Sequence, residues 1–404
     1  MPAAPCAAGR KKTQRMAEKT FLITEIERDG RKYTAAAYYE EGVLSLLKVC
    51  PSGETVRTGE VVLGTVTDVV QNIGAAFADA GGERVYISDA RKWDPQIRPG
   101  KCVLLQRIAD ERDRKRARAS MRLSFAGRYA VVSEGSGFSV SLKLTEGQKE
   151  TLGGWKDEMP AMRHVVLRTN AAYAAKAEVL AEVKSLSERI DSIRERAKTR
   201  TTHSVLYRPQ PFYVRMYTDV YGTDPVRTVT DLAAVRDAFA DYSDEGFPVP
   251  ELWTDGDLPL PAVYNLDRDI ARLLQKTVYM KSGAYLLIEK TEAFTAIDVN
   301  SGKCAKGKKA EETYRRINLE AAAEVARQIR LRSLSGVILV DFISMKDPDH
   351  NTELIAVMRK ALRQDHVHTE AVDLTPLGIM EIVRHRTERT LADVFVAGEA
   401  EEEE

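Results

Sequence analysis

The sequence predicts an α/β protein built from several subdomains. Its 404 residues exceed one ordinary core, because a typical length of about 150 residues per domain gives two or three domains. Short β-rich runs separated by glycine and proline fill residues 59–108, and strand-like runs alternate with helix-like runs over residues 284–388. The first pattern is typical of a small barrel, and the second of parallel strands joined by helical crossovers.

The composition indicates a folded protein of a reducing compartment. Hydrophobic residues make up 44% of the chain and charged residues 30%, and the 60 basic and 60 acidic residues cancel, so that only a local patch could attract an anionic partner. No segment has the roughly 18 consecutive apolar residues that span a bilayer. Cys6, Cys50, Cys102 and Cys304 are far apart and form no CxxC pair, which argues against a zinc knuckle and against a disulfide framework. We therefore expect a reducing, cytoplasmic location.

The amino-terminal half predicts a hairpin, a barrel and a long helix. Asp29-Gly30 is a hairpin signal between strand-like runs at residues 20–30 and 32–49. The barrel is expected from runs at 59–70, 74–81, 83–88 and 101–108. Strands at 128–133 and 163–170 follow, and then helices at about 171–198, 230–242 and 265–277.

The carboxyl-terminal part predicts a sheet with crossover helices. Strands are expected at 284–291, 293–300, 336–344 and 368–374, and helices at about 310–334, 352–364 and 376–388. The helix at 310–334 has an apolar stripe, and we interpret its other face as solvated; that face carries Arg315, Arg316, Arg327, Arg330 and Arg332.

Two acids stand in otherwise apolar strands of this part. Asp298 and Asn300 share one face of their strand, and Asp341 lies in the next strand, which the crossover rule makes parallel to the first. A buried lone aspartate is costly unless it is paired or binds a metal, and converging carboxylates with an amide oxygen suit Mg²⁺. The alternative is that each aspartate caps a helix or ends a strand, and spacing alone leaves both interpretations open.

Two aromatic residues of the predicted barrel adjoin a basic run. The run contains Arg112, Arg114, Lys115, Arg116 and Arg118. Phe77 and Tyr86 could stack on the bases of single-stranded nucleic acid beside this positive charge, or they could be core residues of the barrel. The pattern favours neither alternative.

Several of these motifs together resemble the catalytic half of the ribonuclease E and ribonuclease G family, and are most similar to bacterial ribonuclease G-like proteins. The resemblance is most specific in TEAFTAIDVNSGK, NLEAAAEVARQIRLRSLSGVILVDFISM and LGIMEIVRHR, and it extends more weakly through GAAFADAGGER and SFAGRYAVV. It covers nearly the whole chain after residue 20.

The resemblance implies a fold with an OB-fold RNA-binding barrel, a 5′-end sensor, a ribonuclease-H-like subdomain in two segments and a deoxyribonuclease-I-like catalytic subdomain. The corresponding boundaries are a disordered basic tail at 1–19, the first ribonuclease-H-like segment at 20–56, the barrel at 57–121, the sensor at 122–216, the second ribonuclease-H-like segment at 217–273, the catalytic subdomain at 274–397 and an acidic tail at 398–404.

The implied function is Mg²⁺-dependent endoribonuclease cleavage of single-stranded, A/U-rich RNA in rRNA processing and mRNA decay, leaving 5′-phosphate products. Mn²⁺ is a candidate substitute for Mg²⁺. Matching residue by residue makes Asp298 and Asp341 the metal-binding aspartates and Asn300 their catalytic partner. It also assigns Phe77, Tyr86 and Lys115 to RNA contact, and Gly127, Val131, Arg168 and Thr169 to a pocket for a 5′-monophosphate.

The sequence departs from the family pattern at three places. In the barrel, GGERVY is one residue shorter than the usual family spacing, which displaces the second aromatic residue, Tyr86. The family carries a CxxC pair after the nuclease subdomain, at which two chains share zinc; this sequence has none, which argues against a structural zinc and leaves open a homodimer without a zinc link. His366 and His368 replace basic residues that the family often has near the 5′ pocket. The alternative functions are a non-catalytic RNA-binding or ribosome-assembly factor and, less favoured, a DNA nuclease.

Overall fold

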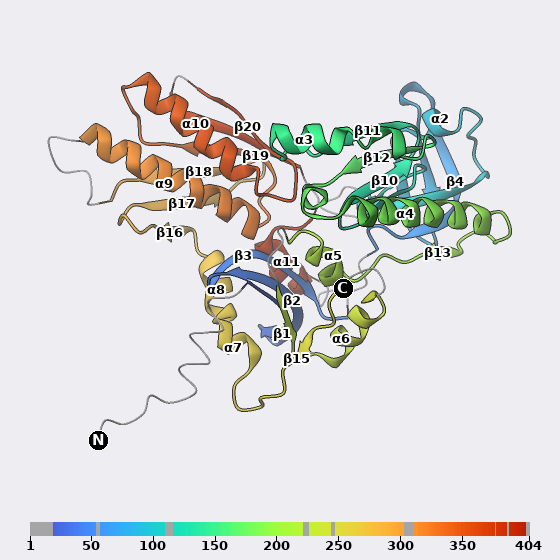
Figure 1. Cartoon of the computed structure of the whole chain (residues 1–404), viewed down its shortest axis with the longest axis horizontal. Helices are drawn as coiled ribbons and strands as arrows, with labels where there is room; N and C mark the ends of the chain where they lie inside the picture. The colour runs from blue at the N-terminus through green and yellow to red at the C-terminus, as the bar shows by residue number, and fades with distance from the viewer. Residues whose placement is uncertain are drawn as a thin grey trace. The chain divides into compact units, whose positions relative to one another are not determined.

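The computed structural model describes residues 19–53, 57–109, 116–220, 226–243, 247–302, 310–375, 377–385 and 388–400. Contacts divide the chain into two compact units, one drawn from Met1–Glu54 with Asp224–Glu404 and the other from Thr55–Thr223. The class is mixed α/β, as predicted, with four sheets among the described residues (Figure 1). In the same ranges, no helix combines the length and the apolar character needed to cross a membrane.

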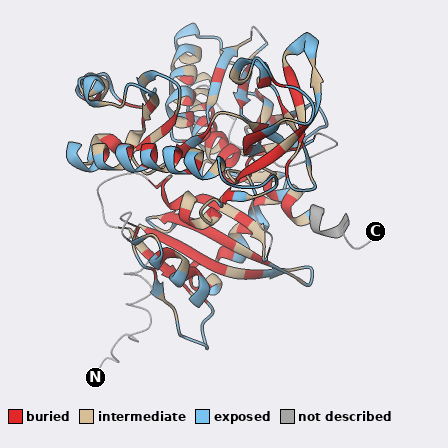
Figure 2. Ribbon diagram, turned by 90° about the vertical axis from the view of Figure 1, so that its right-hand side faces the viewer, coloured by how far each residue is buried: buried red, intermediate tan, exposed pale blue. Residues whose placement is uncertain are grey.

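The first sheet of the first unit joins two distant segments of the chain. Its strand order is β15-β14-β1-β2-β3, and β14 runs parallel to β1. Long buried runs in these strands form one side of a core, which Figure 2 shows in red. The strands are β1 (Thr20–Arg28), β2 (Arg31–Glu40), β3 (Val43–Pro51), β14 (Arg227–Thr230) and β15 (Glu251–Leu252), and the neighbouring helices are α6 (Ala233–Ala240), α7 (Leu260–Tyr264) and α8 (Leu266–Leu273).

Two tight turns shape the hairpins of this sheet. Asp29 and Gly30 both have positive φ angles, 51° and 75°, which confirms the hairpin signal read from the sequence. Glu41 and Gly42 repeat this geometry with φ angles of 50° and 76°, and so divide the run at 32–49 into β2 and β3.

The second sheet of this unit has six strands in the order β16-β17-β18-β19-β21-β20. One face forms an apolar core with two crossover helices, whereas the other face carries exposed or half-buried side chains. The elements are β16 (Thr277–Tyr279), β17 (Tyr285–Lys290), β18 (Phe294–Asn300), α9 (Ala310–Leu331), β19 (Gly336–Asp341), α10 (Pro348–Leu362), β20 (Thr369–Leu374), β21 (Ile379–Arg384) and α11 (Leu391–Ala400). Figure 1 shows α9 and α10 running side by side.

The prediction of a helix at 376–388 is wrong. Residues 379–384 form β21, which pairs antiparallel with both β19 and β20. Met380, Ile382 and Arg384 are buried while Glu381 and Val383 are exposed, a period of two that fits a strand. The sheet is thus mixed. The expected parallel pairing is confirmed for β18 with β19, but β17 pairs antiparallel with β18.

The interpretation of a solvated arginine face on α9 is wrong near the carboxyl end of the helix. Arg330 is 7% exposed and Arg332 8% exposed. Arg330 Nε donates to the Ser45 carbonyl at 3.0 Å, and Arg327 Nη1 donates to the Leu44 carbonyl at 3.1 Å. These guanidinium groups thus fasten α9 to β3 of the first sheet, because strand carbonyls accept their hydrogen bonds.

The second unit contains a closed five-stranded barrel that is OB-like. Its strands pair in the cycle β4-β5-β6-β8-β7, and β7 returns to β4 to close the barrel. The sequence runs predicted four of them and missed β8, which begins at Arg118, the last residue of the basic run. The strands are β4 (Val61–Val70), β5 (Ala75–Asp79), β6 (Arg84–Ile87), β7 (Cys102–Ala109) and β8 (Arg118–Ser120); the short helix α2 (Ala90–Trp93) follows β6, and β13 (Val205–Tyr207) adds to β4.

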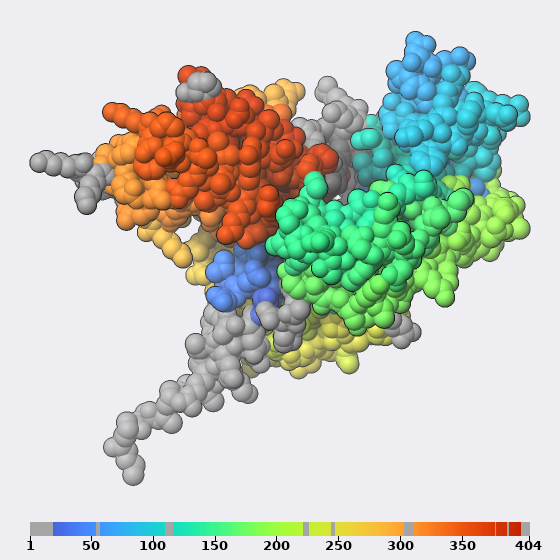
Figure 3. All heavy atoms as spheres, turned by 45° about the horizontal axis from the view of Figure 1, so that its top comes forward, coloured from blue at the N-terminus to red at the C-terminus, as the bar shows by residue number. Residues whose placement is uncertain are grey.

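A four-stranded sheet and a long helix share an apolar core with part of the barrel. The strand order is β11-β12-β10-β9, and buried residues of α4 pack against this sheet and against Val61, Leu63 and Leu104. Figure 3 shows the barrel residues in blue to cyan beside the green surface of this part. The elements are β9 (Ser124–Ala126), β10 (Ala130–Glu134), β11 (Gly137–Val140), α3 (Glu146–Gly153), β12 (Arg163–Leu167), the 3₁₀ turn η3 (Thr169–Tyr173), α4 (Lys176–Ala197) and α5 (Phe212–Tyr217).

Candidate functional site

Asp298 and Asp341 lie side by side in the second sheet of the first unit. They are register partners on the parallel strands β18 and β19, one pair beyond the buried partners Ile297 and Val340. Neighbouring residues in register project to the same face of a sheet, so both carboxylates lie on the face opposite α9 and α10. The crossover through α9 creates this pair, as the sequence predicted.

Asn300 lies two residues after Asp298 on the same face. Its Nδ2 donates a hydrogen bond of 2.6 Å to Oδ2 of Asp298. This bond fixes the orientation of the Asp298 carboxylate and leaves its other oxygen available to a ligand.

The expectation that Asp298 is buried is wrong. Asp298 and Asp341 are both exposed, because α9 and α10 cover only the other face of the sheet. The acids therefore need no metal to offset burial, and only their convergence on one sheet face indicates a metal site. The alternative that each aspartate caps a helix or ends a strand is wrong for Asp298, which lies inside β18. Asp341 does end a strand, because it is the last residue of β19.

The donor set fits a hard cation with few protein ligands. Two carboxylates and a nearby amide oxygen match the way Mg²⁺ binds proteins while keeping several waters. Among the residues that the structure describes, no group of three or more histidine, cysteine, aspartate or glutamate side chains could enclose a metal. The assignment of Asp298 and Asp341 as metal ligands stays a prediction.

Phe77 and Tyr86 form an aromatic pair on the barrel. They are register partners on β5 and β6, both are half-buried, and their ring centroids are 5.4 Å apart. The guanidinium of Arg84 lies 4.7 Å from the centroid of Phe77, and that of Arg116 lies 5.8 Å from it. Arg84 also forms an ion pair with Asp68.

This cluster joins positive charge to aromatic surface, which is what single-stranded nucleic acid requires of a binding groove. The sequence reasoning missed Arg84, although its position two residues before Tyr86 on the same strand face was a usable signal. Lys115 lies outside the described residues.

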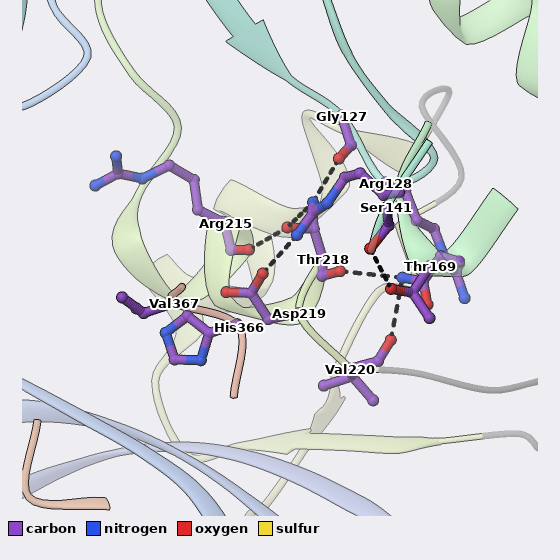
Figure 4. A network of polar contacts seen from close by, with 12 residues as sticks. Gly127, Arg128, Ser141, Thr169, Arg215, Thr218, Asp219, Val220, His366 and Val367 are labelled. Atoms are coloured by element: carbon purple, nitrogen blue, oxygen red, sulfur yellow. Dashed lines mark hydrogen bonds and ion pairs between the residues drawn. The ribbon is translucent and has the colours of Figure 1, made fainter. Parts of the chain in front are cut away.

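Arg168 is at the centre of a polar network in the second unit, and Figure 4 labels its partners Gly127, Thr218 and Asp219. Its Nη1 donates to the carbonyl of Gly127 at 2.7 Å and to Oγ1 of Thr218 at 3.2 Å, and its Nη2 donates to Oδ1 of Asp219 at 2.7 Å. The guanidinium is about one-fifth exposed, and so is Asp219. The predicted phosphate-binding arginine is therefore already paired with a carboxylate.

A second carboxylate occupies the backbone donors beside Gly127. Glu182 accepts hydrogen bonds from the backbone N–H of Arg128 at 2.5 Å and of Tyr129 at 2.7 Å. Burial raises the pKa of Glu182, although these backbone bonds oppose the rise. A Cβ at position 127 would lie 2.0 Å from the Glu182 carboxylate, so Gly127 is needed for this close approach.

The other two predicted pocket residues, Thr169 and Val131, have no hydrogen bond to Arg168 or Gly127 among the contacts that the described residues show. Thr169 Oγ1 lies 3.3 Å from Ser141 Oγ. Val131 is half-buried in β10, between Ala126 of β9 and Val166 of β12. Of the four residues, Gly127 and Arg168 are joined directly by a hydrogen bond, and the role of all four in sensing a 5′ end stays a prediction.

Comparison with known proteins identifies the family. The model of the ribonuclease E/G family matches residues 124–387. A ribonuclease E of Nostoc sp. is 28% identical over 93% of this chain and 57% of its own length; a ribonuclease G of Escherichia coli is 27% identical over 90% of this chain and 79% of its own length. A ribonuclease G of Haemophilus influenzae is 26% identical, and the match covers 90% of this chain and 79% of its own length.

The chain thus spans just over half the length of the Nostoc relative and about four-fifths of the ribonuclease G relatives. The family match contains both Asp298 and Asp341 and the strands that bring them together. This protein belongs to the ribonuclease E/G family.

Proposed function

We propose that this protein is an endoribonuclease that cleaves single-stranded RNA with Mg²⁺, or with Mn²⁺ as a substitute. The observation that carries the proposal is the register pairing of Asp298 with Asp341 on one exposed sheet face. Family membership supports it, because the relatives are named as ribonucleases.

Asp298 and Asp341 would hold the metal, and Asn300 would keep the Asp298 carboxylate oriented through its 2.6 Å hydrogen bond. Bound Mg²⁺ supplies Lewis acidity, which polarises a phosphoryl oxygen and makes a water molecule more acidic. In the proposed reaction a water oxygen attacks phosphorus, the bond from phosphorus to the 3′ oxygen breaks, and the water proton passes to that oxygen. The products are a 5′-phosphate and a 3′-hydroxyl.

The barrel would bind unpaired bases of the substrate. Phe77 and Tyr86 offer ring surface to these bases, and Arg84 and Arg116 place positive charge beside the rings. We also propose that Lys115 extends this charge. Stacking is tolerant of sequence, so this surface would favour single strands over a particular motif.

Family membership supports finer proposals. These are an OB-fold barrel, a 5′-end sensor, a ribonuclease-H-like and a deoxyribonuclease-I-like subdomain, with A/U-rich rRNA precursors and mRNA as substrates in the cytoplasm. A 5′-monophosphate would be read by Gly127, Val131, Arg168 and Thr169, and would compete there with the carboxylates of Asp219 and Glu182. A homodimer also belongs to these proposals.

The proposal is tested with single-stranded RNA labelled at either end, with Mg²⁺ or with a chelator. We expect internal cuts that need Mg²⁺, with the 5′-phosphate on the downstream product. RNA binding without cuts under all metal conditions would instead identify a non-catalytic RNA-binding factor, and equal cleavage of single-stranded DNA would contradict RNA as the specific substrate.

A further inference from the structure

Two tyrosines lie on the same exposed face as the acid pair. Tyr279 on β16 and Tyr285 on β17 are register partners, with ring centroids 5.9 Å apart and ring planes inclined by 52°. Tyr279 is 79% exposed, and Tyr285 is half-buried. A ring of this size that packed only for stability would be buried far more, because tyrosine gains its stabilisation from apolar contact.

Strand register connects these rings to the acid site. Tyr285 is the partner of Asn300, and Asp298 lies two residues before Asn300 on the same face. Neighbouring strands are about 4.8 Å apart and same-face residues about 7 Å apart along a strand, so the tyrosine pair begins within about 10 Å of Asp298. Figure 1 shows β16, β17 and β18 as consecutive strands.

A cation lies on the turn between the two tyrosine strands. Lys281 is exposed in this turn, which also contains Gly283. The turn approaches the chain just after Asn300, because a Cβ at position 302 would lie 2.7 Å from the carbonyl oxygen of Gly283. Gly302 has a φ of 58°, and therefore both its conformation and its surroundings require glycine.

The exposed face consequently has two chemically different ends. At the end with Asp298 and Asn300 it offers tyrosine rings and a lysine, whereas towards the other end it carries apolar side chains together with the exposed carboxylates of Glu289 and Glu381. Phe294 and Val337, 38% and 45% exposed, are register partners at that other end. Aromatic rings with a cation beside them suit a base and its phosphate, whereas an end with exposed carboxylates repels a phosphate.

We propose that Tyr279 and Tyr285 stack on the base of a nucleotide adjoining the phosphodiester held at Asp298 and Asp341, and that Lys281 contacts the backbone phosphate of that nucleotide. The inference rests on the proposed ribonuclease function for the identity of the occupant. It adds to the acid site a base-binding subsite in the same sheet, separate from the aromatic pair of the barrel.

The test measures equilibrium binding rather than cleavage. Short single-stranded RNAs, each with one abasic nucleotide at a successive position, are titrated onto the full-length Asp298→Asn protein and onto the same protein carrying Tyr279→Ala and Tyr285→Leu. We expect one position at which the missing base weakens binding about 5- to 100-fold with the tyrosines present. The penalty at that position should fall to less than about 2-fold once they are replaced, because the stacking contribution is then lost.

Two control variants test whether the penalty arises from stacking at this place on the sheet. Tyr279→Phe should keep the penalty, and Phe294→Ala at the other end of the face should leave it unchanged. Because Tyr279 is highly exposed, Tyr279→Ala alone keeps the test valid if the double variant does not fold. A penalty that is the same with and without the tyrosines overturns the inference, and so does a change of oligomeric state on Tyr279→Ala with unaltered RNA binding.

The outcomes also distinguish the inference from the proposed function. Wild-type protein that binds RNA and shows the tyrosine-dependent penalty but makes no cut contradicts the nuclease proposal and keeps the subsite. Metal-dependent cleavage with a penalty indifferent to the tyrosines keeps the nuclease and removes the subsite.

Discussion

Asp298 and Asp341 are register partners on adjacent parallel strands and extend from the same exposed face of the sheet. Their apolar neighbours Ile297 and Val340 face the helices and belong to the core. The alternation of each strand therefore separates the two tasks: one set of alternate positions builds the core, and the other set carries the acids. The carboxylates can therefore be replaced without loss of core packing, so a change in cleavage rate in such variants reflects the lost carboxylate.

Replacing Asn300 with alanine should impair the acid pair without removing a carboxylate. Loss of the 2.6 Å bond frees the Asp298 carboxylate to rotate, and loss of such an orienting partner typically costs about 10- to 100-fold in activity or metal affinity. The measurement is the cleavage rate as a function of Mg²⁺ concentration, with exposed Glu292→Gln as control. An unchanged rate at limiting Mg²⁺ would show that Asn300 does not position the acid.

Replacing Phe77 with alanine should weaken binding of single-stranded RNA about 5- to 100-fold, because base stacking on an aromatic ring contributes about 1–3 kcal/mol. Phe77→Tyr should retain most of the affinity. Tyr173→Ala, which removes a half-exposed aromatic of the same unit outside the barrel, is the matched control. Equal losses for Phe77→Ala and Tyr173→Ala would argue against a specific role for the barrel pair.

Replacing Asp219 with asparagine should increase the preference for a 5′-monophosphate. The wild-type carboxylate neutralises Arg168 at 2.7 Å, and asparagine keeps the size but removes the competing charge. We expect the ratio of cleavage rates for 5′-phosphorylated and 5′-hydroxyl RNA to rise several-fold. Asp191→Asn, which changes an exposed partner of Arg163, serves as control. A fall in the ratio would mean that Asp219 orients Arg168 rather than competing for it.

Replacing Glu388 with glutamine should destabilise the protein at neutral pH. Burial opposes ionisation of Glu388, but Lys48, His366 and Ser333 together lower its pKa from 4.5 to about 2. The folded pKa lies below the unfolded value, so the stabilisation is complete above about pH 4.5 and is lost as pH falls towards about 2. We expect a cost of about 1–3 kcal/mol at pH 7 by urea unfolding.

The pH dependence provides its own control for Glu388. The difference in unfolding free energy between wild type and Glu388→Gln should shrink between about pH 4.5 and 2, because the wild-type carboxyl then becomes neutral as well. A difference that stays constant over this range would show that shape, rather than charge, is responsible.

The acid pair illustrates how far the sequence predicts the site. The convergence of Asp298 and Asp341 was predictable, because consecutive strands joined by a helix are usually parallel and often neighbours in one sheet. The exposure of the acids was not predictable in the same way. Both strands are mainly apolar, and no local pattern reveals that the helices cover one face only.

Other features that the sequence did not predict also depend on tertiary contacts. The strand-helix alternation that precedes residues 379–384 predicts a helix there, but tertiary pairing with β19 makes this segment a strand. Arg168 and Asp219 are far apart in the sequence, and nothing local couples their charges. The sequence gives no sign that Tyr279 and Tyr285 lie near Asn300, because only the register of three strands places them there.

The central claim, that Asp298 and Asp341 form a metal-dependent cleavage site, is tested by comparing Asp298→Asn, Asp341→Asn and Glu289→Gln on one single-stranded RNA over a range of Mg²⁺ concentrations. Glu289 is an exposed carboxylate of β17 in the same sheet. We predict that each aspartate variant lowers the cleavage rate at least about 100-fold while RNA affinity stays within about 3-fold, and that Glu289→Gln cleaves like wild type. A cleavage rate equal to that of wild type in either aspartate variant would contradict the account.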